Sequence, residues 1–383
     1  MKMKLFAAAV AALAAGGAYA QSSVTLYGVV DAGIEYQNHQ PNVAGQTGSH
    51  DVVRLTSGNM SGSRWGLRGV EDLGGGLKGI FVLESGFSVD TGTSGQGNRL
   101  FGRQAFVGVQ SQFGQLTLGR HQTPFYDFGL AFDPMAISTN YSITSQGVEF
   151  QSRADNSIKY IGTFGGVTGQ LLYSTGSNTG AAAPTAANAA YQGNNGELPG
   201  NYHTGREMSA SLVYAGGPFS LGVIYDETNI GNTAIPDAKI RRASAAGTYA
   251  FGPAKIFAGY RWAKAYDGAL LPGGVSIGNT TVASRSNLYW LGAGYQLTPA
   301  LSLTGAAYYQ DFANTGADPW SFVVSTDYAF SKRTDAYLNV AYTKNKDGSN
   351  LGLQGTGVGG SGFGGVQGSA NQFGAVVGVR HKF

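Results

Sequence analysis

The sequence contains no cysteine, few prolines and little charge. Of its 383 residues, 11 are proline and only 12% are charged. Without cysteine there is no disulfide framework, no cysteine nucleophile and no thiolate metal site. When Lys2 and Lys4 at the N-terminus are set aside, 23 basic residues (25 − 2) remain against 22 acidic ones. No strong global field for binding nucleic acid is therefore expected.

The first twenty residues differ from the rest. Lys2 and Lys4 precede an apolar run over 5–15, and Ala18-Tyr19-Ala20 has the small-x-small pattern of a cleavage site. These features predict a cleaved signal peptide over 1–20 and a mature chain over 21–383. The run is too short for a membrane-spanning helix, and no later stretch approaches the required apolar length.

Glycine and aromatic residues are abundant, with 61 Gly, 21 Tyr and 20 Phe. Apolar residues alternate with polar or small ones along most of the mature chain. In the last segment, Phe373, Val377 and Val379 share one face, whereas Gly378 and Arg380 share the other. This period of two indicates β-strands. Alternation alone fits both a soluble β-protein and a transmembrane barrel.

The connections between the alternating segments fall into two classes that succeed each other along the chain. Seven are short and turn-like, at 72–76, 112–114, 164–166, 215–218, 251–253, 297–299 and 330–332. Eight are long and polar, at about 38–61, 88–101, 122–151, 176–204, 229–239, 267–285, 313–319 and 346–370.

Fifteen connections of alternating length predict an all-β fold, a transmembrane antiparallel β-barrel of sixteen strands. Such barrels have short periplasmic turns and long extracellular loops. An even strand number lets the first and last strands pair and close the sheet, which leaves no unpaired edge in lipid. Aromatic residues at strand ends, among them Tyr260, Trp262, Tyr308 and Tyr309, are expected to form girdles at the membrane interfaces.

Several stretches together resemble the Gram-negative general porin family, in the branch typical of betaproteobacteria. They are SSVTLYG at 22–28, SRWGLRG at 63–69, EDLGGGLK at 71–78, RQAFVG at 103–108, FG through LGR at 113–120, SKRT at 331–334 and VRHKF at 379–383. The resemblance covers nearly the whole mature chain. It implies a sixteen-stranded barrel, usually a homotrimer, whose third loop, about 122–151, folds into the lumen.

The resemblance also implies a pore constriction in which basic residues of the wall oppose acidic residues. By motif position the basic residues are Arg64, Arg103 and Arg153, and the acidic ones are Glu84 on the wall and Asp127 on the loop. Alternation places Arg64 on one face with Arg68, and Arg153 on one face with Asp155 and Lys159. A basic side chain facing lipid near the midplane costs about 2–4 kcal/mol, so these faces should point into the lumen.

Arg103 is assigned from the resemblance alone. Alternation would place its side chain on the same face as Val107 and Val109, which is expected to point outward. Three arginines against two acids suggest a mild anion preference. This anion preference would be opposed by other acidic residues that face the lumen, among them Asp31 and Glu35.

The chain ends on Phe383, which resembles the terminal signal recognised by the barrel assembly machinery of the outer membrane. The other expected partners are outer-membrane lipid and lipopolysaccharide, and the expected solutes are small hydrophilic molecules and ions. No nucleic acid, cofactor or metal is expected. A substrate-specific channel or a surface adhesin on the same barrel is the alternative function.

Two features that could suggest other chemistry do not support it. Residues 355–360 match G-x-G-x-x-G, but they lie in a Gly/Ser-rich loop with no helical pattern after them. A barrel enzyme would need a nucleophile within reach of a histidine. His121, beside the third loop, is the one histidine worth considering, and no nucleophile motif lies near it. No catalytic residues are therefore assigned.

Overall fold

The computed structural model describes residues 22–40, 50–146, 150, 153–177, 197, 202–230, 237–269, 271, 276–277, 280–281, 284–354, 365–366 and 369–383. The proposed signal peptide, the G-x-G-x-x-G segment and parts of the long loops lie outside these ranges.

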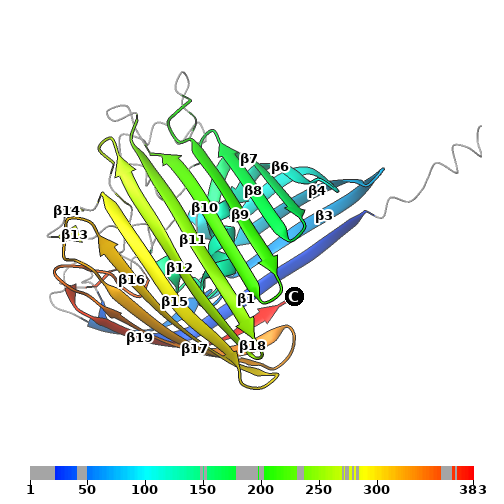
Figure 1. Ribbon diagram of the computed structural model, residues 1–383. Helices are drawn as coiled ribbons and strands as arrows, with labels where there is room; N and C mark the ends of the chain where they lie inside the picture. The colour runs from blue at the N-terminus through cyan, green and yellow to red at the C-terminus, as the bar shows by residue number, and fades with distance from the viewer. Residues whose placement is uncertain are drawn as a thin grey trace, which may run out of the picture.

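The described chain forms one antiparallel sheet that closes on itself through pairing of β1 with β19 (Figure 1). Its strands are β1 (Ser23–Gln40), β2 (His50–Ser57), β3 (Arg64–Gly74), β4 (Leu77–Gly86), β5 (Gln104–Ser111), β6 (Gly114–Gln122), β7 (Arg153–Phe164), β8 (Val167–Ser174), β9 (Glu207–Gly216), β10 (Phe219–Asn229), β11 (Lys239–Phe251), β12 (Ala254–Tyr266), β15 (Arg285–Gln296), β16 (Leu301–Phe312), β17 (Trp320–Ala329), β18 (Thr334–Lys344) and β19 (Gln372–Lys382). Between β12 and β15 lies a small hairpin of β13 (Ser276–Ile277) and β14 (Thr280–Thr281).

The sheet contains seventeen strands but sixteen barrel positions, because β2 and β3 share one. The long strand β1 pairs with β3 through its first half and with β2 through its second half. The expectation of an uninterrupted loop over 38–61 is therefore wrong: the stretch contains β2. The break between β2 and β3 is fixed by Asp31, whose carboxylate accepts hydrogen bonds from the Met60 and Ser61 amides at 2.9 and 2.8 Å.

With this correction, the predicted sixteen-strand barrel is confirmed. Seven short turns join strand pairs at one end, and eight longer connections lie at the other. The first half of β1 and the C-terminal residue meet at the short-turn end, where Gly28 and Phe383 exchange backbone hydrogen bonds of 3.0 and 3.1 Å. The structure has no helix, among the residues described, that is long and apolar enough to cross a membrane.

The outer face of the barrel is apolar and highly exposed, as alternation predicts for a lipid-facing surface. On β2, Val53 and Leu55 are 71% and 66% exposed, and every barrel strand contributes similar side chains. A belt of touching rings crosses four neighbouring strands, with Tyr260, Tyr289, Tyr309 and Trp320 at successive centroid distances of 5.1, 6.1 and 4.6 Å. Placing Tyr308 in such a girdle is wrong, because Tyr308 is fully buried inside the barrel.

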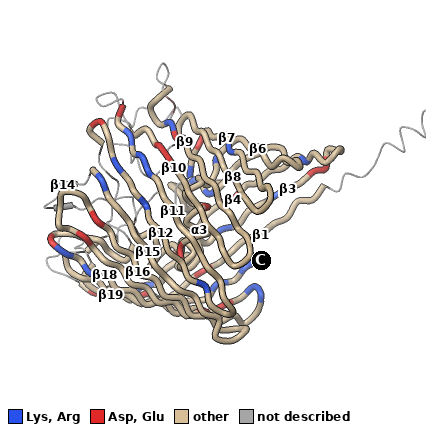
Figure 2. The backbone as a smooth tube through the Cα atoms, in the orientation of Figure 1, with Lys and Arg blue, Asp and Glu red and all other residues tan. Residues whose placement is uncertain are grey.

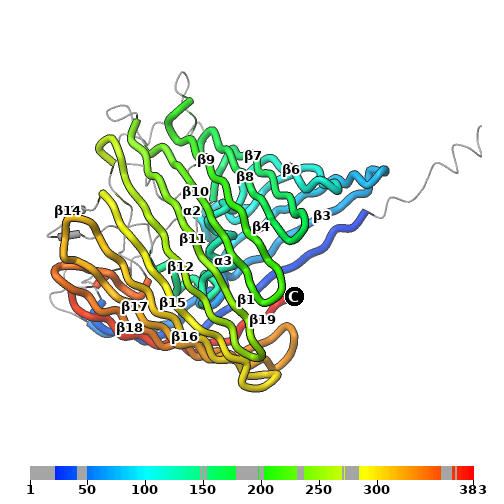
Figure 3. Tube along the Cα trace, in the orientation of Figure 1, coloured from blue at the N-terminus to red at the C-terminus, as the bar shows by residue number. Residues whose placement is uncertain are grey.

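The third loop, which we call L3 (described at residues 123–146 and 150), folds into the lumen and carries the helix α3 (Pro124–Phe132), seen inside the barrel in Figure 3. Thr123 caps α3 by accepting a hydrogen bond from the Tyr126 amide, and Pro124 occupies the first turn, where its missing N–H costs nothing. A 3-10 turn (Ile143–Ser145) follows along L3. A short irregular turn, α2 (Gly95–Asn98), lies in the second loop.

L3 is held against the wall by an aromatic cluster. Phe125, Phe128 and Phe132 of α3 are buried together with Ile224 and Trp290 of the wall. Burial of each phenylalanine contributes about 1.5–3 kcal/mol.

Glycines in the wall make room for L3. A Cβ at Gly222 would lie 2.5 Å from the Phe132 ring, and one at Gly292 would lie 2.3 Å from the Pro134 ring. These two glycines let the loop approach the wall closely.

Candidate pore constriction

Glu84 of β4 is the centre of a cluster of charged residues on the lumen wall. Its carboxylate accepts hydrogen bonds from Arg103 Nε at 2.7 Å and from Tyr27 Oη at 3.0 Å. Arg64 of β3 lies on the other side, with Nε 3.8 Å from the same carboxylate. The structure therefore brings together Arg64, Glu84 and Arg103, three of the five residues expected at the constriction.

Arg103 points into the lumen despite its parity with outward-facing Val107 and Val109. The residue precedes β5, which starts at Gln104, so strand alternation does not govern it. Its backbone amide instead bonds to the Glu84 carbonyl at 3.1 Å, and its side chain is buried against Glu84. Parity gave no information at this position, because the residue lies at the end of a loop.

The helix α3 brings Tyr126 and Asp127 up to the same wall. The Arg153 guanidinium lies over the Tyr126 ring, 5.3 Å from its centroid, and Arg103 Nη2 is 3.5 Å from the Tyr126 hydroxyl. Asp127 accepts a hydrogen bond of 2.6 Å from Lys159 Nζ, which also donates to the Gln122 carbonyl at 2.9 Å. All five expected residues thus lie where L3 leaves β6 and meets β3, β4 and β7.

Lys159 and Tyr126 belong to this cluster and were not among the expected constriction residues. Parity had placed Lys159 on the face of Arg153, but motif matching gave it no role. Tyr126 lies inside the expected third loop, but it is uncharged, and the constriction residues were predicted from their charge. Contact with Asp127 and Arg153 becomes visible only once the path of L3 is known.

The expected shared face of Arg153, Asp155 and Lys159 is interrupted between Asp155 and Lys159. The register between β6 and β7 shifts between Gly119 and His121, and Asn156 has a φ of +47°. Asp155 pairs instead with Arg99 at 2.7 Å and Arg120 at 2.5 Å, which ties the second loop to β6 and β7. A bulge of this kind breaks the alternation on which the expectation rested.

Positive charge exceeds negative charge in the cluster. Four basic residues (Arg64, Arg103, Arg153 and Lys159) stand beside two acidic ones (Glu84 and Asp127), a local difference of 4 − 2 = +2. Both acids are engaged: Glu84 by Arg103 and Tyr27, and Asp127 by Lys159. In a narrow space beside a low-dielectric wall, such an excess acts strongly on a passing ion.

Asp31 and Glu35, two lumen acids expected to oppose an anion preference, are both 0% exposed. Asp31 bonds to the Tyr337 hydroxyl at 2.5 Å in addition to the amides after β2. Glu35 pairs with Arg54 at 2.7 Å and accepts a hydrogen bond from Tyr141 of L3 at 2.6 Å. These carboxylates anchor loops. The charge of Glu35 is compensated by Arg54, and Asp31 is held by neutral hydrogen-bond donors.

Asp133, just after α3, anchors L3 on the opposite wall. Its carboxylate accepts hydrogen bonds from the Tyr308 hydroxyl at 2.5 Å and the Ile137 amide at 2.8 Å, while Trp290 Nε1 donates to the Phe132 carbonyl at 3.0 Å. Burial raises the pKa of Asp133 to about 6, and the hydrogen bonds from Tyr308 and backbone amides limit the rise.

The described part of the chain holds no group of three or more His, Cys, Asp or Glu side chains that could bind a metal ion. His121 is buried, stacks on Phe106 at 4.9 Å and places Nδ1 2.8 Å from the Ser157 hydroxyl. These contacts describe a packed wall residue.

Comparison with known proteins gives one consistent family. The model of the Gram-negative porins matches residues 7–348. An outer membrane porin protein of Bordetella pertussis is 32% identical over 380 residues, which cover 90% of this chain and 95% of that one. Outer membrane porin protein 32 of Delftia acidovorans is 32% identical over 396 residues, covering all of both chains.

Among solved structures, an anion-selective porin from Comamonas acidovorans matches with a TM-score of 0.73 and 28% identity, over 95% of this chain and 100% of that one. The closed sixteen-position barrel with a lumen-folded third loop agrees with these matches. The chain belongs to the Gram-negative porin family, and it is a porin of the outer membrane.

Proposed function

We propose that this porin allows passive diffusion of small hydrophilic solutes and ions with a preference for anions, and that Arg64, Arg103, Arg153, Glu84 and Asp127 form its constriction. The observation that carries the proposal is the excess of four basic over two acidic side chains where L3 meets the wall. Lys159 and Tyr126 complete the site. The similar Comamonas porin is described as anion-selective, which agrees with this reading.

The geometry suggests how an anion would pass. Glu84 and Tyr27 hold the Arg103 and Arg64 side of the wall in place, and the Tyr126 ring supports the Arg153 guanidinium from the loop side. Guanidinium groups present several N–H donors in a fixed plane, so they can replace part of the hydration shell of an anion without large rearrangement. A cation gains no comparable ligand, because both acids already accept hydrogen bonds.

The channel activity is tested with purified protein in planar bilayers and in liposomes. We expect discrete conductance steps in KCl, and swelling of liposomes in small uncharged sugars but not in large dextrans. Proteoliposomes that stay impermeable to the small sugars would contradict the diffusion channel.

We further propose that the protein is exported by its first twenty residues and assembles as a homotrimer through the assembly machinery, in contact with outer-membrane lipid and lipopolysaccharide. The family resemblance and the exposed apolar outer face support this. N-terminal sequencing of the membrane form should begin at Gln21. On unheated detergent gels the protein should run as a slow oligomer that collapses on boiling, and a monomer after mild extraction would contradict the trimer.

A further inference from the structure

We propose that Arg68 of β3, held over the ring of Tyr27 of β1, forms a second anion site on the short-turn side of the constriction. Its ligands are small oxyanions, namely phosphate and the carboxylate groups of small solutes. The proposal rests on the proposed function, because such a site matters only in a channel that anions cross. It adds a step to the ion path that lies apart from the residues assigned to the constriction, and we call it the Arg68 site (Arg68 and Tyr27).

Arg68 lies on the lumen wall below the constriction cluster. It follows Arg64 by four residues along β3, so alternation places both side chains on the same face of the strand. Four residues span about 13 Å of a strand, and β3 runs from Arg64 toward its short turn with β4. Arg68 is therefore displaced from the constriction toward the short-turn end of the lumen. Figure 2 shows basic segments in blue along β3.

Tyr27 connects Arg68 to the constriction and positions it. The register partner of Tyr27 is Gly66, which lies between the two arginines, and a Cβ at Gly66 would lie 2.8 Å from Cζ of the Tyr27 ring. The ring therefore fills the space over Gly66. Its hydroxyl donates a hydrogen bond to Glu84 at 3.0 Å, and the Arg68 guanidinium lies 5.5 Å from the ring centroid. Such a cation–π contact holds the guanidinium but leaves its positive charge in place.

The guanidinium donors of Arg68 are open to the lumen. Arg68 is exposed, and among the described residues it makes neither a hydrogen bond nor an ion pair. The next acidic residue on the same face of β3 is Asp72, four residues further on, and it is in register with Lys78 of β4. A guanidinium binds carboxylate and phosphate through two parallel hydrogen bonds. Arg68 can therefore take an oxyanion directly from the water in the pore.

Two anion sites in series would help an anion to cross the pore. Conduction requires binding that is favourable enough for an ion to enter and weak enough for it to leave, and neighbouring sites achieve this through repulsion between successive ions. The strand positions of Arg64 and Arg68 are about 13 Å apart, which is close to the Debye length of about 10 Å at 0.1 M. Anions at the two sites would therefore influence each other at low salt.

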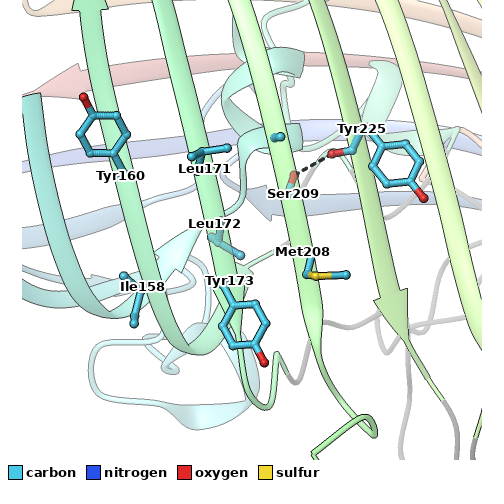
Figure 4. Close-up of a pocket in the computed structure, with 9 residues that line it drawn as sticks. Ile158, Tyr160, Leu171, Leu172, Tyr173, Met208, Ser209 and Tyr225 are labelled. Carbon is cyan, nitrogen blue, oxygen red and sulfur yellow. Dashed lines mark hydrogen bonds between the residues drawn. The ribbon is translucent and has the colours of Figure 1, made fainter.

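An apolar hollow elsewhere in the barrel wall does not suit an anion. The hollow has a volume of about 390 Å³ and lies on the outer face of β7–β10, where Ile158, Leu171, Met208 and Tyr225 surround it (Figure 4). None of the side chains that line it is charged. An anion in this hollow would lose its hydration without gaining a charged partner, which is unfavourable.

The test is the block of the chloride current by inorganic phosphate, measured on the purified porin in planar bilayers. The main variant is Arg68→Gln, which removes the charge and keeps a long polar side chain. A second variant is Thr25→Glu, because Thr25 of β1 is in register with Arg68 and a carboxylate there would occupy its donors. The matched controls are Thr25→Gln, which adds no charge, and Lys78→Gln, which removes one positive charge nearer the short turn.

We expect the phosphate concentration that halves the chloride current to rise about tenfold in Arg68→Gln, because hydrogen bonds to a charged group are lost. Thr25→Glu should raise this concentration by a similar factor. Thr25→Gln and Lys78→Gln should keep nearly the value of the parent. All four variants should still form conducting channels, since Arg68, Thr25 and Lys78 are exposed residues.

Equal block of Arg68→Gln and the parent by phosphate would overturn the proposal. An equal loss of block in Lys78→Gln would also overturn it, because the effect would then be that of any charge near the short turn. If Arg68→Gln does not conduct, Thr25→Glu and Thr25→Gln become the deciding pair, and equal block of these two would overturn the Arg68 site. A parent that shows no anion preference in its zero-current potential would instead contradict the proposed function.

Discussion

Replacing Arg64 and Arg153 with serine tests the constriction by removing half of its basic residues. The cluster then has two basic and two acidic side chains, 2 − 2 = 0, in place of +2. Glu84 keeps its 2.7 Å bond to Arg103, and Asp127 keeps its 2.6 Å bond to Lys159, so no acid loses its main partner. The barrel should therefore still fold, because lumen substitutions mainly tune selectivity.

The size of the effect follows from Coulomb's law. A unit charge about 5 Å from the ion path changes the energy of a monovalent ion by about 0.8 kcal/mol at the dielectric constant of water. Two charges give about 1.6 kcal/mol, which screening over a Debye length of about 10 Å at 0.1 M reduces to about 1 kcal/mol. Since anions and cations shift in opposite directions, the anion-to-cation permeability ratio should fall roughly thirtyfold. At 1 M, where the Debye length is about 3 Å, the change should shrink to roughly threefold.

The assay is the zero-current potential across a planar bilayer under a KCl gradient, measured at low and high salt. The matched control is Lys332→Ser with Arg333→Ser, which removes two positive charges at the short-turn end, and Lys346→Ser is a second control in an outer loop. Both should keep nearly the parent potential. A double arginine variant that conducts but retains the parent potential would refute the constriction assignment and leave these arginines as ordinary wall residues.

Three further predictions concern L3, its anchor and assembly. Gly292→Ala places a methyl group 2.3 Å from the Pro134 ring, so it should push L3 into the lumen, lower the single-channel conductance and cost about 1–3 kcal/mol of stability. The control Gly294→Ala, where the nearest atom is 3.5 Å away, should change neither the conductance nor the stability. Equal conductances of the two variants would contradict the contact between L3 and the wall at Gly292. Burial raises the pKa of Asp133 from 3.8 to about 6, so the stability contributed by the protonated carboxyl is full below pH 3.8 and lost as pH rises through 6. The free energy of unfolding should therefore fall between pH 5 and pH 8 by about 1.4 kcal/mol more in the parent than in Asp133→Asn. Parallel thermal-unfolding profiles of the two proteins would contradict this. Phe383 exchanges backbone hydrogen bonds with Gly28 and covers it with its ring. Deleting Phe383 should reduce insertion into the outer membrane, whereas Phe383→Tyr should not. Normal surface levels of the truncated protein at low expression would contradict a role of Phe383 as the assembly signal.

Much of the fold could be predicted from local sequence pattern, because a strand between lipid and water alternates residue by residue. The seven turns and the lumen-folded third loop followed from this pattern and from the family resemblance. Alternation could not predict that two strands, β2 and β3, share the second position of the barrel. Residues 50–57 alternate, but their pairing with the second half of β1 depends on Asp31 holding the chain at Met60 and Ser61.

Within the constriction, the sequence motifs predicted which charged residues take part, whereas their contact partners follow only from the fold. Arg64, Glu84 and Arg103 came from motif position, and the structure places them in one cluster. Lys159 was missed because its role depends on Asp127, which reaches it only through the path of L3. Tyr308 was misplaced because two adjacent tyrosines on a strand must face opposite sides. Alternation with the exposed Leu303 puts Tyr309 outward and Tyr308 inward, where Tyr308 contacts Asp133.

The most direct test of the central claim is the zero-current potential of the unmodified porin under a tenfold KCl gradient at low salt. The +2 excess at the constriction predicts a potential of the sign given by chloride passing more easily than potassium, which weakens as the salt concentration rises. A potential of the opposite sign, or one that does not change with salt concentration, would contradict an anion preference arising from these side chains.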